Sequence, residues 1–248
     1  MEIKEQSGLR SVLEDVEIPK MFCVRQKFSR DGVEDVPAVL REKLDQEALK
    51  ARIKPGMTVV MTGSSRQIAN MAAILRELAS FVKQLGANPY VIPAMGSHGG
   101  ATAEGQLEIL ESFGITEASC GCPIFSSMET VQVGRLENGD EVRVDKFAHD
   151  ADAIIVVGRI KAHTAFRGPY ESGLIKMMAI GMGKREGADS LHRSGFQVMG
   201  ERLPQYAKVV YDHCNIVFGV GTIENEFDQT CRIEVIPGEE IFQREPEL

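Results

Sequence analysis

Four side chains able to bind anions, ligate metals or transfer protons come shortly after apolar, strand-like runs of the sequence. Arginine and lysine bind anions, and histidine transfers protons near neutral pH or ligates metals. In an open α/β sheet, ligands bind beyond the carboxyl ends of the strands. We therefore expect a common site for Arg66, His98, Lys161 and His163.

The loops that carry two of these residues suit a ligand. Ser64, Ser65 and Arg66 stand at a predicted strand-to-helix turn, where free N–H groups of a helix suit a phosphate or carboxylate. A serine-rich helix cap with an exposed arginine is the alternative. His98 is flanked by three glycines, which let the backbone approach a ligand closely. The competing interpretation is a loop histidine with only a local hydrogen bond.

Lys176 is the single charge in the apolar run 173–183 (GLIKMMAIGMG). Apolar surroundings lower the pKa of a lysine, and the neutral amine is a nucleophile. The position therefore suits a covalent link to a cofactor, as a Schiff base, amide or thioamide. The alternative is a lysine that extends from an amphipathic helix to water.

The glycine-rich segment 181–187 (GMGKREG) matches neither common nucleotide-binding motif. A P-loop needs glycine where Met178 stands and serine or threonine where Arg185 stands. A dinucleotide fingerprint needs glycine where Glu186 stands. We expect a tight turn here, which either lies near a ligand or is only a turn of the chain.

Composition limits the classes of protein to consider. The chain has 248 residues, 43% of them hydrophobic and 26% charged, which predicts one large domain with a sizeable core. A net charge of −8 argues against a nucleic-acid surface, and no apolar run is long enough to span a membrane. The start, MEIKEQSGLR, lacks a signal-peptide core. The five cysteines lack framework spacing, so we expect reduced thiols and a cytoplasmic protein, with Cys120 and Cys122 as ordinary thiols rather than a metal site.

Short β-rich runs alternate with helical patterns. This predicts an α/β fold: a doubly wound, largely parallel sheet flanked by helices, with a β-hairpin added at Asn138-Gly139. The predicted strands are 57–62, 89–95, 153–158 and 216–220. The predicted helices are 67–85 and a segment capped by Thr102 that ends near Gly114.

Residues 1–240 are predicted to form one α/β domain. Residues 241–248 are interpreted as the start of an interdomain linker, with a C-terminal domain missing from this chain. A natural frayed tail is the alternative.

The chain order of the polar residues resembles a known family, the nickel-dependent lactate racemases and their relatives that act on other 2-hydroxy acids. The resemblance runs from about Val59 to the end of the chain and is carried by Arg66, His98, His163, Lys176 and His192. It implies that Lys176 carries a nickel-pincer nucleotide (pyridinium-3,5-bisthiocarboxylic acid mononucleotide with Ni) and that His192 ligates the nickel. It further implies that His98 and His163 are the catalytic acid and base.

The resemblance also implies the surrounding contacts. Arg66 resembles an active-site arginine that would contact the substrate. Beside it, Ser64 and Ser65 of the turn and Gly181 near Lys176 are expected to contact the cofactor, and Arg167 is expected to bind the substrate in place of a cation that this chain lacks after His98. The family usually has Asp-x-Thr-Arg-Pro where this chain has GSSRQ, and commonly Arg-Pro after the first histidine, where this chain has two glycines. These departures indicate a relative that acts on a 2-hydroxy acid other than lactate.

The resemblance makes residues 1–240 the N-terminal domain that binds the cofactor and carries the catalytic residues. The function that it implies is that of an isomerase, a racemase or epimerase that inverts C2 of a 2-hydroxy acid by hydride transfer. Its expected partners are that small acid and a C-terminal domain of the same protein, and neither nucleic acid nor a membrane. Two other classes remain open: a zinc or iron hydrolase or lyase with histidine ligands, and a non-enzymatic domain that binds an anion or nucleotide.

Overall fold

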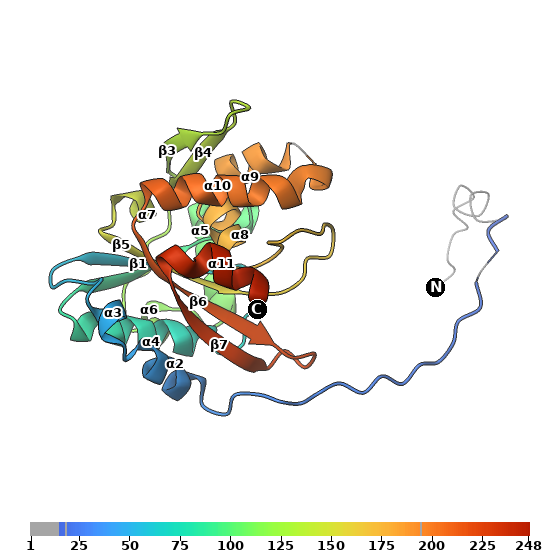
Figure 1. The fold of residues 1–248 in the computed structure, drawn as a ribbon, viewed down its shortest axis with the longest axis horizontal. Helices are drawn as coiled ribbons and strands as arrows, with labels where there is room; N and C mark the ends of the chain where they lie inside the picture. The colour runs from blue at the N-terminus through green and yellow to red at the C-terminus, as the bar shows by residue number, and fades with distance from the viewer. Residues whose placement is uncertain (1–14, 18, 194) are drawn as a thin grey trace, which may run out of the picture.

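A five-stranded sheet with the strand order β2-β1-β5-β6-β7 forms the centre of the fold (Figure 1). The computed structural model describes residues 15–17, 19–193 and 195–248, so the predicted lack of a signal-peptide core at residues 1–10 lies outside them. Neighbouring strands are parallel except for β7, which runs antiparallel to β6. The strands are β1 (Thr58–Gly63), β2 (Asn88–Pro93), β5 (Ala153–Arg159), β6 (Ile216–Glu224) and β7 (Thr230–Pro237). The predicted doubly wound, largely parallel sheet is confirmed.

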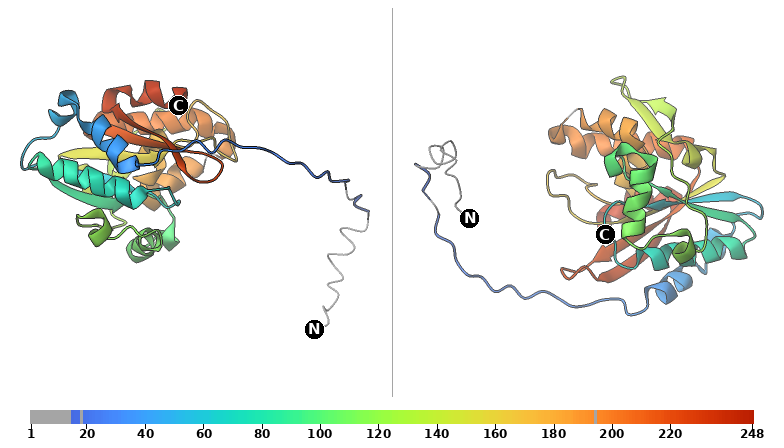
Figure 2. Two further views of the ribbon diagram at one scale, coloured as in Figure 1. Left: turned by 90° about the horizontal axis from the view of Figure 1, so that it is seen from below. Right: turned by 180° about the vertical axis from the view of Figure 1, so that it is seen from behind.

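Helices cover both faces of this sheet, as Figure 2 shows. Strand β5 is apolar and buried along nearly its whole length, as expected of a parallel strand with helices on both sides. Its alternate residues enter two separate hydrophobic clusters. Helices α2 (Val36–Leu44) and α4 (Met71–Gln84) pack in one cluster, and α8 (Leu174–Lys176) and α10 (Met199–His213) pack in the other.

The predicted hairpin is present as a separate two-stranded sheet of β3 (Thr130–Arg135) and β4 (Glu141–Asp145). Gly139 adopts a left-handed φ of 91° in its turn, where glycine is favoured. The remaining α-helices are short and lie around the sheet: α3 (Glu47–Lys50), α5 (Ala103–Ser112), α6 (Glu117–Cys120), α7 (Lys146–Asp150), α9 (Lys184–His192) and α11 (Ile241–Arg244).

One predicted helix boundary is wrong, and one is confirmed. The helix expected from Gln67 begins only at Met71, because Asn70 is left-handed (φ 62°) and the preceding N–H, of Ala69, donates to the carboxylate of Glu224. Thr102 caps α5 as predicted, since its hydroxyl accepts from the N–H of Gly105 at 3.1 Å.

The two cysteines of the CxC pair are buried in the fold. Cys120 and Cys122 are free and buried, and burial raises the pKa of both thiols. Among the described residues, no helix combines the length and the apolar character needed to cross a bilayer.

Residues 241–248 pack against the domain. Ile241 is fully buried in the same hydrophobic cluster as α8 and α10. The carboxylate of Glu245, only 4% exposed, accepts a hydrogen bond from the N–H of Ile175 at 3.0 Å. The described residues before Phe28 run away from the sheet as an extended chain (Figure 1). Closer to α2, Phe28 and Arg30 contact the ring of Phe227, and the N–H of Val33 donates to the carbonyl oxygen of Thr230 in β7.

Candidate active site

The predicted site residues lie on loops at one edge of the sheet. Strands β1, β2 and β5 are parallel neighbours, so their carboxyl ends meet at the same edge. The strand order reverses at β1, which connects to β2 on one side and pairs with β5 on the other, and open α/β sheets bind their ligands at such a reversal. The loops after these strands carry Arg66, His98 and His163.

His98 is held in place by a glycine-rich turn. Gly96, Gly99 and Gly100 all have left-handed φ values, and a Cβ on Gly99 would lie 2.5 Å from the backbone of Gly105. These glycines therefore shape the turn and its approach to α5. The imidazole Nδ1 of His98 lies 2.6 Å from the hydroxyl oxygen of Ser65. Burial, followed by nearby positive charges including Lys176, lowers the pKa of His98, which favours the neutral imidazole at neutral pH.

His163 lies on the loop after β5, where the surrounding backbone fixes its tautomer. Its Nδ1 accepts from the N–H of Ala165 at 3.1 Å, which leaves the proton of the neutral ring on Nε2. Its own N–H donates to Glu171 at 2.6 Å, and its ring lies 4.4 Å from that of Phe166. Burial and then the charge of Lys176 lower the pKa of His163. Lys176 thus acts electrostatically on both histidines.

Lys176 ends the short helix α8, which continues into a π-helical turn at Met177–Gly181. Burial, followed by the positive charges of Arg66 and Lys161, lowers the pKa of Lys176 to about 8. The direction of this shift is the one expected from the apolar run around the amine. At pH 8 about half of the Lys176 side chains carry a nucleophilic neutral amine.

The positive charges around Lys176 are not neutralised by the protein. In the part of the chain that the structure describes, no ion pair joins Arg66, Lys161 or Lys176 to a carboxylate. Like charges placed together raise each other's free energy, and a bound anion would relieve this repulsion. The site therefore favours a ligand with phosphate or carboxylate groups.

His192 is oriented as a metal ligand would be. Its Nδ1 lies 2.6 Å from the carbonyl oxygen of Ala188, to which it can donate, so the lone pair of Nε2 remains available. Metal-ligating histidines commonly have such a second hydrogen bond. Within the described residues, however, no three histidine, cysteine or carboxylate side chains lie close enough to bind a metal ion by themselves. The arrangement of the described residues therefore does not favour the histidine-built zinc or iron site considered from the sequence.

The other predicted contacts have partners within the protein. Ser64 is buried, and its hydroxyl accepts from the N–H of Arg66, while the nearest helix, α4, begins farther along the chain. The expected anion site at a helix N-terminus is therefore absent from this turn. The guanidinium of Arg167 donates to the carbonyl oxygens of His163 and Phe166, within its own loop. A Cβ on Gly181 would lie 2.8 Å from the carbonyl oxygen of Ala94, so the protein itself fills that space.

Two buried charged groups next to the site were missed from the sequence. Lys184 is fully buried and pairs with Asp145, and Glu245 accepts N–H groups at the start of α8. Lys184 belongs to the segment 181–187, which was interpreted only as a turn. Nothing in the sequence pattern distinguishes this lysine from Lys176 as the more deeply buried one.

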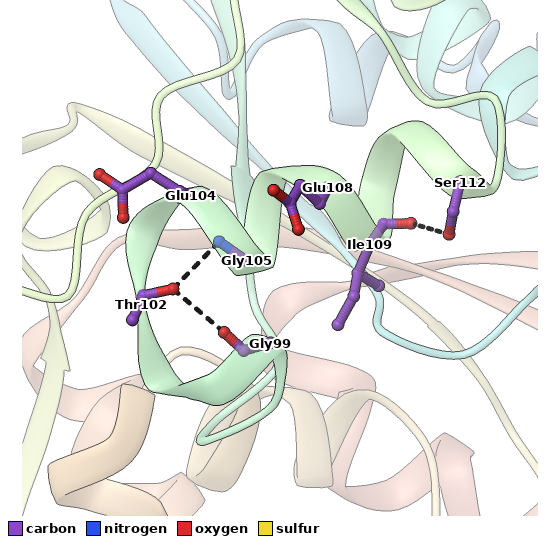
Figure 3. Close-up of a pocket in the computed structure, with 7 residues that line it drawn as sticks. All are labelled: Gly99, Thr102, Glu104, Gly105, Glu108, Ile109 and Ser112. Carbon is purple, nitrogen blue, oxygen red and sulfur yellow. Dashed lines mark hydrogen bonds between the residues drawn. The ribbon is translucent and has the colours of Figure 1, made fainter.

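A pocket beside the His98 loop is a different feature. It is lined by Gly99 and residues of α5, including Glu104 and Glu108, one helical turn apart (Figure 3). None of the predicted site residues lines it. Its two carboxylates would repel the anionic ligand that Arg66, Lys161 and Lys176 favour.

Comparison with known proteins identifies the family. The family model of the lactate racemase N-terminal domain matches residues 12–203. The chain belongs to this family. No curated protein matches the chain in sequence.

A solved structure shares the fold of this lactate racemase N-terminal domain. It is the lactate racemase apoprotein from Thermoanaerobacterium thermosaccharolyticum, with 14% sequence identity and a TM-score of 0.59. The match covers 85% of this chain and 54% of that one, so the chain spans about half the length of its solved relative. At this identity the likeness supports the fold alone.

Proposed function

We propose that this chain is the cofactor-binding domain of a racemase or epimerase that inverts C2 of a 2-hydroxy acid. The observation that carries the proposal is the lowered pKa of Lys176, an amine that influences two histidines and lies among unpaired cations. The family match supports a racemase-type activity in general. We further propose a C-terminal domain of the same protein as partner and the cytoplasm as location.

The residues present fit a lysine-tethered nickel-pincer nucleotide. The amine of Lys176 is available for the covalent link, and Arg66 and Lys161 provide positive charge for a phosphate. The exposed Nε2 of His192 can ligate a nickel ion that is otherwise bound by the sulfur atoms of the nucleotide, a ligand set that suits nickel. A metal held mainly by its nucleotide needs no cluster of three protein ligands. When bound, this group would supply the acceptance and return of a hydride.

His98 and His163 would perform the proton transfers. The free ring nitrogen of neutral His98 would take the hydroxyl proton of the substrate as C2 is oxidised to a ketone, and His163 in its protonated form would return a proton to that oxygen after reorientation. For the opposite enantiomer the roles are exchanged, and Nδ1 of His163 must then release the N–H of Ala165 so that Nε2 is free to act as the base. Two bases serve the two mirror-image substrates. In each direction one ring must be neutral and the other protonated, and the lowered pKa values of both rings favour the neutral form that the base requires.

The test uses protein purified from cells able to make the nucleotide. Intact-mass and peptide analysis should find an adduct on Lys176, metal analysis should find nickel, and chiral chromatography should detect inversion of a 2-hydroxy acid. Lys176→Arg should abolish all three results. Lys208→Arg, which alters an exposed lysine of α10, is the matched control. Protein that is unmodified, free of nickel and inactive on a panel of 2-hydroxy acids would refute the proposal.

A further inference from the structure

A buried lysine links the two parts of the site through hydrogen bonds. Lys184 begins α9 in a left-handed conformation (φ 52°), and its side chain is fully buried. Its ammonium lies 2.9 Å from a carboxylate oxygen of Asp145. It donates to the carbonyl oxygen of Pro93 at 2.5 Å and to the amide oxygen of Gln106 at 3.1 Å.

Gln106 extends this network from α5 to the His98 loop. Its amide nitrogen donates to the carbonyl oxygens of Gly96 at 2.8 Å and of His98 at 3.2 Å. An ammonium group can only donate, so Lys184 requires the amide oxygen of Gln106 to face it. The NH₂ group must then face the loop. Lys184 thereby fixes which carbonyl groups Gln106 can bind.

A backbone contact ties the same loop to the helix of Lys176. The N–H of Gly96 donates to the carbonyl oxygen of Gly181, at the end of the π-helical turn that follows Lys176. Lys184 comes soon after this turn in the chain. The His98 loop is therefore bonded to the segment after Lys176 both directly and through Gln106.

Burying this charge is expensive, because both partners lose their hydration. An apolar side chain could fill the same space, but it would not orient Gln106. We propose that Lys184 and Gln106 are positioning residues that fix the backbone of the His98 loop relative to Lys176. The proposal rests on the proposed function in taking His98 as a proton-transfer group, whereas the network itself is independent of that role.

The primary test is Gln106→Met, which preserves most of the side-chain volume and removes both donors. Amide hydrogen exchange at Gly96 and His98 should accelerate about tenfold, because the variant lacks two buried hydrogen bonds. The ring ¹⁵N spectrum should lose the signature of the hydrogen bond between His98 and Ser65, while the His163 signals stay unchanged. Ser112→Ala, at the exposed end of the same helix, is the control and should leave both measurements unchanged.

A second variant separates the donors from packing. Gln106→Glu retains the shape and the acceptor for Lys184 but lacks the two donors, so it should loosen the loop as Gln106→Met does. It also provides the measurement if the methionine variant does not fold. In the loaded enzyme, either variant should lower kcat about tenfold with little change in KM, because the network does not touch the substrate.

The outcomes distinguish this proposal from the proposed function. If His98→Gln remains fully active, the proton-transfer role fails, and hydrogen exchange still tests the positioning of the loop. If His98→Gln is inactive but the Gln106 variants leave exchange, ring spectrum and kcat unchanged, the positioning role is refuted.

Discussion

Removing the ammonium of Lys184 should lower the free energy of unfolding far more than removing an exposed ammonium does. The side chains of Lys184 and Asp145 are both fully buried, and their charged atoms are 2.9 Å apart. Burial lowers the pKa of Lys184 and raises that of Asp145, so desolvation offsets much of their attraction. Lys184→Met leaves the carboxylate without its counter-charge. We expect a loss of about 3 to 5 kcal/mol in the free energy of unfolding at pH 8.

The pH dependence of this variant gives a second diagnostic. Without Lys184, folding at neutral pH requires Asp145 to stay protonated, whereas the unfolded chain releases that proton above a pH of about 4. The folded state then binds more protons than the unfolded state. The stability of Lys184→Met relative to the unmodified protein should therefore improve as the pH falls from 8 to 5.

The double variant Lys184→Met/Asp145→Asn tests the cause of this loss. It removes both charges, and the asparagine oxygen can still accept the N–H of Ala148 that Asp145 accepts at 3.1 Å. Its loss should be smaller than that of Lys184→Met by about 2 kcal/mol. Urea unfolding followed by circular dichroism measures all variants. The control Lys208→Met breaks an exposed pair with Asp212 and should cost at most about 0.5 kcal/mol. The reasoning fails if Lys184→Met costs no more than this control.

Three further predictions concern groups around Lys176. Competitive acylation of Lys176, followed by mass spectrometry, should show half-maximal reactivity near pH 8. Arg66→Ala should move this midpoint to a higher pH, because it removes a nearby positive charge. An unchanged midpoint would contradict the assigned cause. Burial raises the pKa of Glu245 from 4.5 to about 7. Between pH 4.5 and about pH 7 the folded state therefore retains a proton that the unfolded state loses, and the free energy of unfolding falls as the pH rises through this range. Glu245→Gln should remove this slope and gain up to about 3 kcal/mol at pH 8 in urea unfolding, whereas an equal slope in both proteins would exclude Glu245 as its origin. In protein from cells that make the nucleotide, His192→Ala should keep the adduct on Lys176 but lose nickel by metal analysis, and full nickel content would rule out His192 as a ligand.

The sheet was predictable because its strands are apolar and regularly spaced. The β5 run AIIVVG is typical of a strand buried on both faces, and the Asn-Gly pair predicts the hairpin turn. The start of α4 was missed because Asn70 is left-handed, and the contact of Ala69 with Glu224 joins segments far apart in the sequence. Strand β7 was not predicted at all.

The site was predictable to the extent that it depends on strand ends and local composition. Arg66, His98 and His163 each follow a predicted strand, and the apolar run around Lys176 indicated its lowered pKa. The partners of Lys184 could not be predicted. Asp145 and Gln106 lie on separate elements, and only the folded chain brings their side chains to the ammonium.

The contact between Glu245 and α8 determines where the chain can be shortened for biochemical work. The Glu245 carboxylate accepts backbone N–H groups of Leu174 and Ile175, and a Cβ on Gly173 would lie 2.6 Å from it. A fragment ending at residue 240 would leave these donors, which lie one and two residues before Lys176, without their acceptor. Its lysine reactivity and cofactor loading would then differ from those of the intact chain. Fragments made for labelling or loading should therefore extend through Leu248.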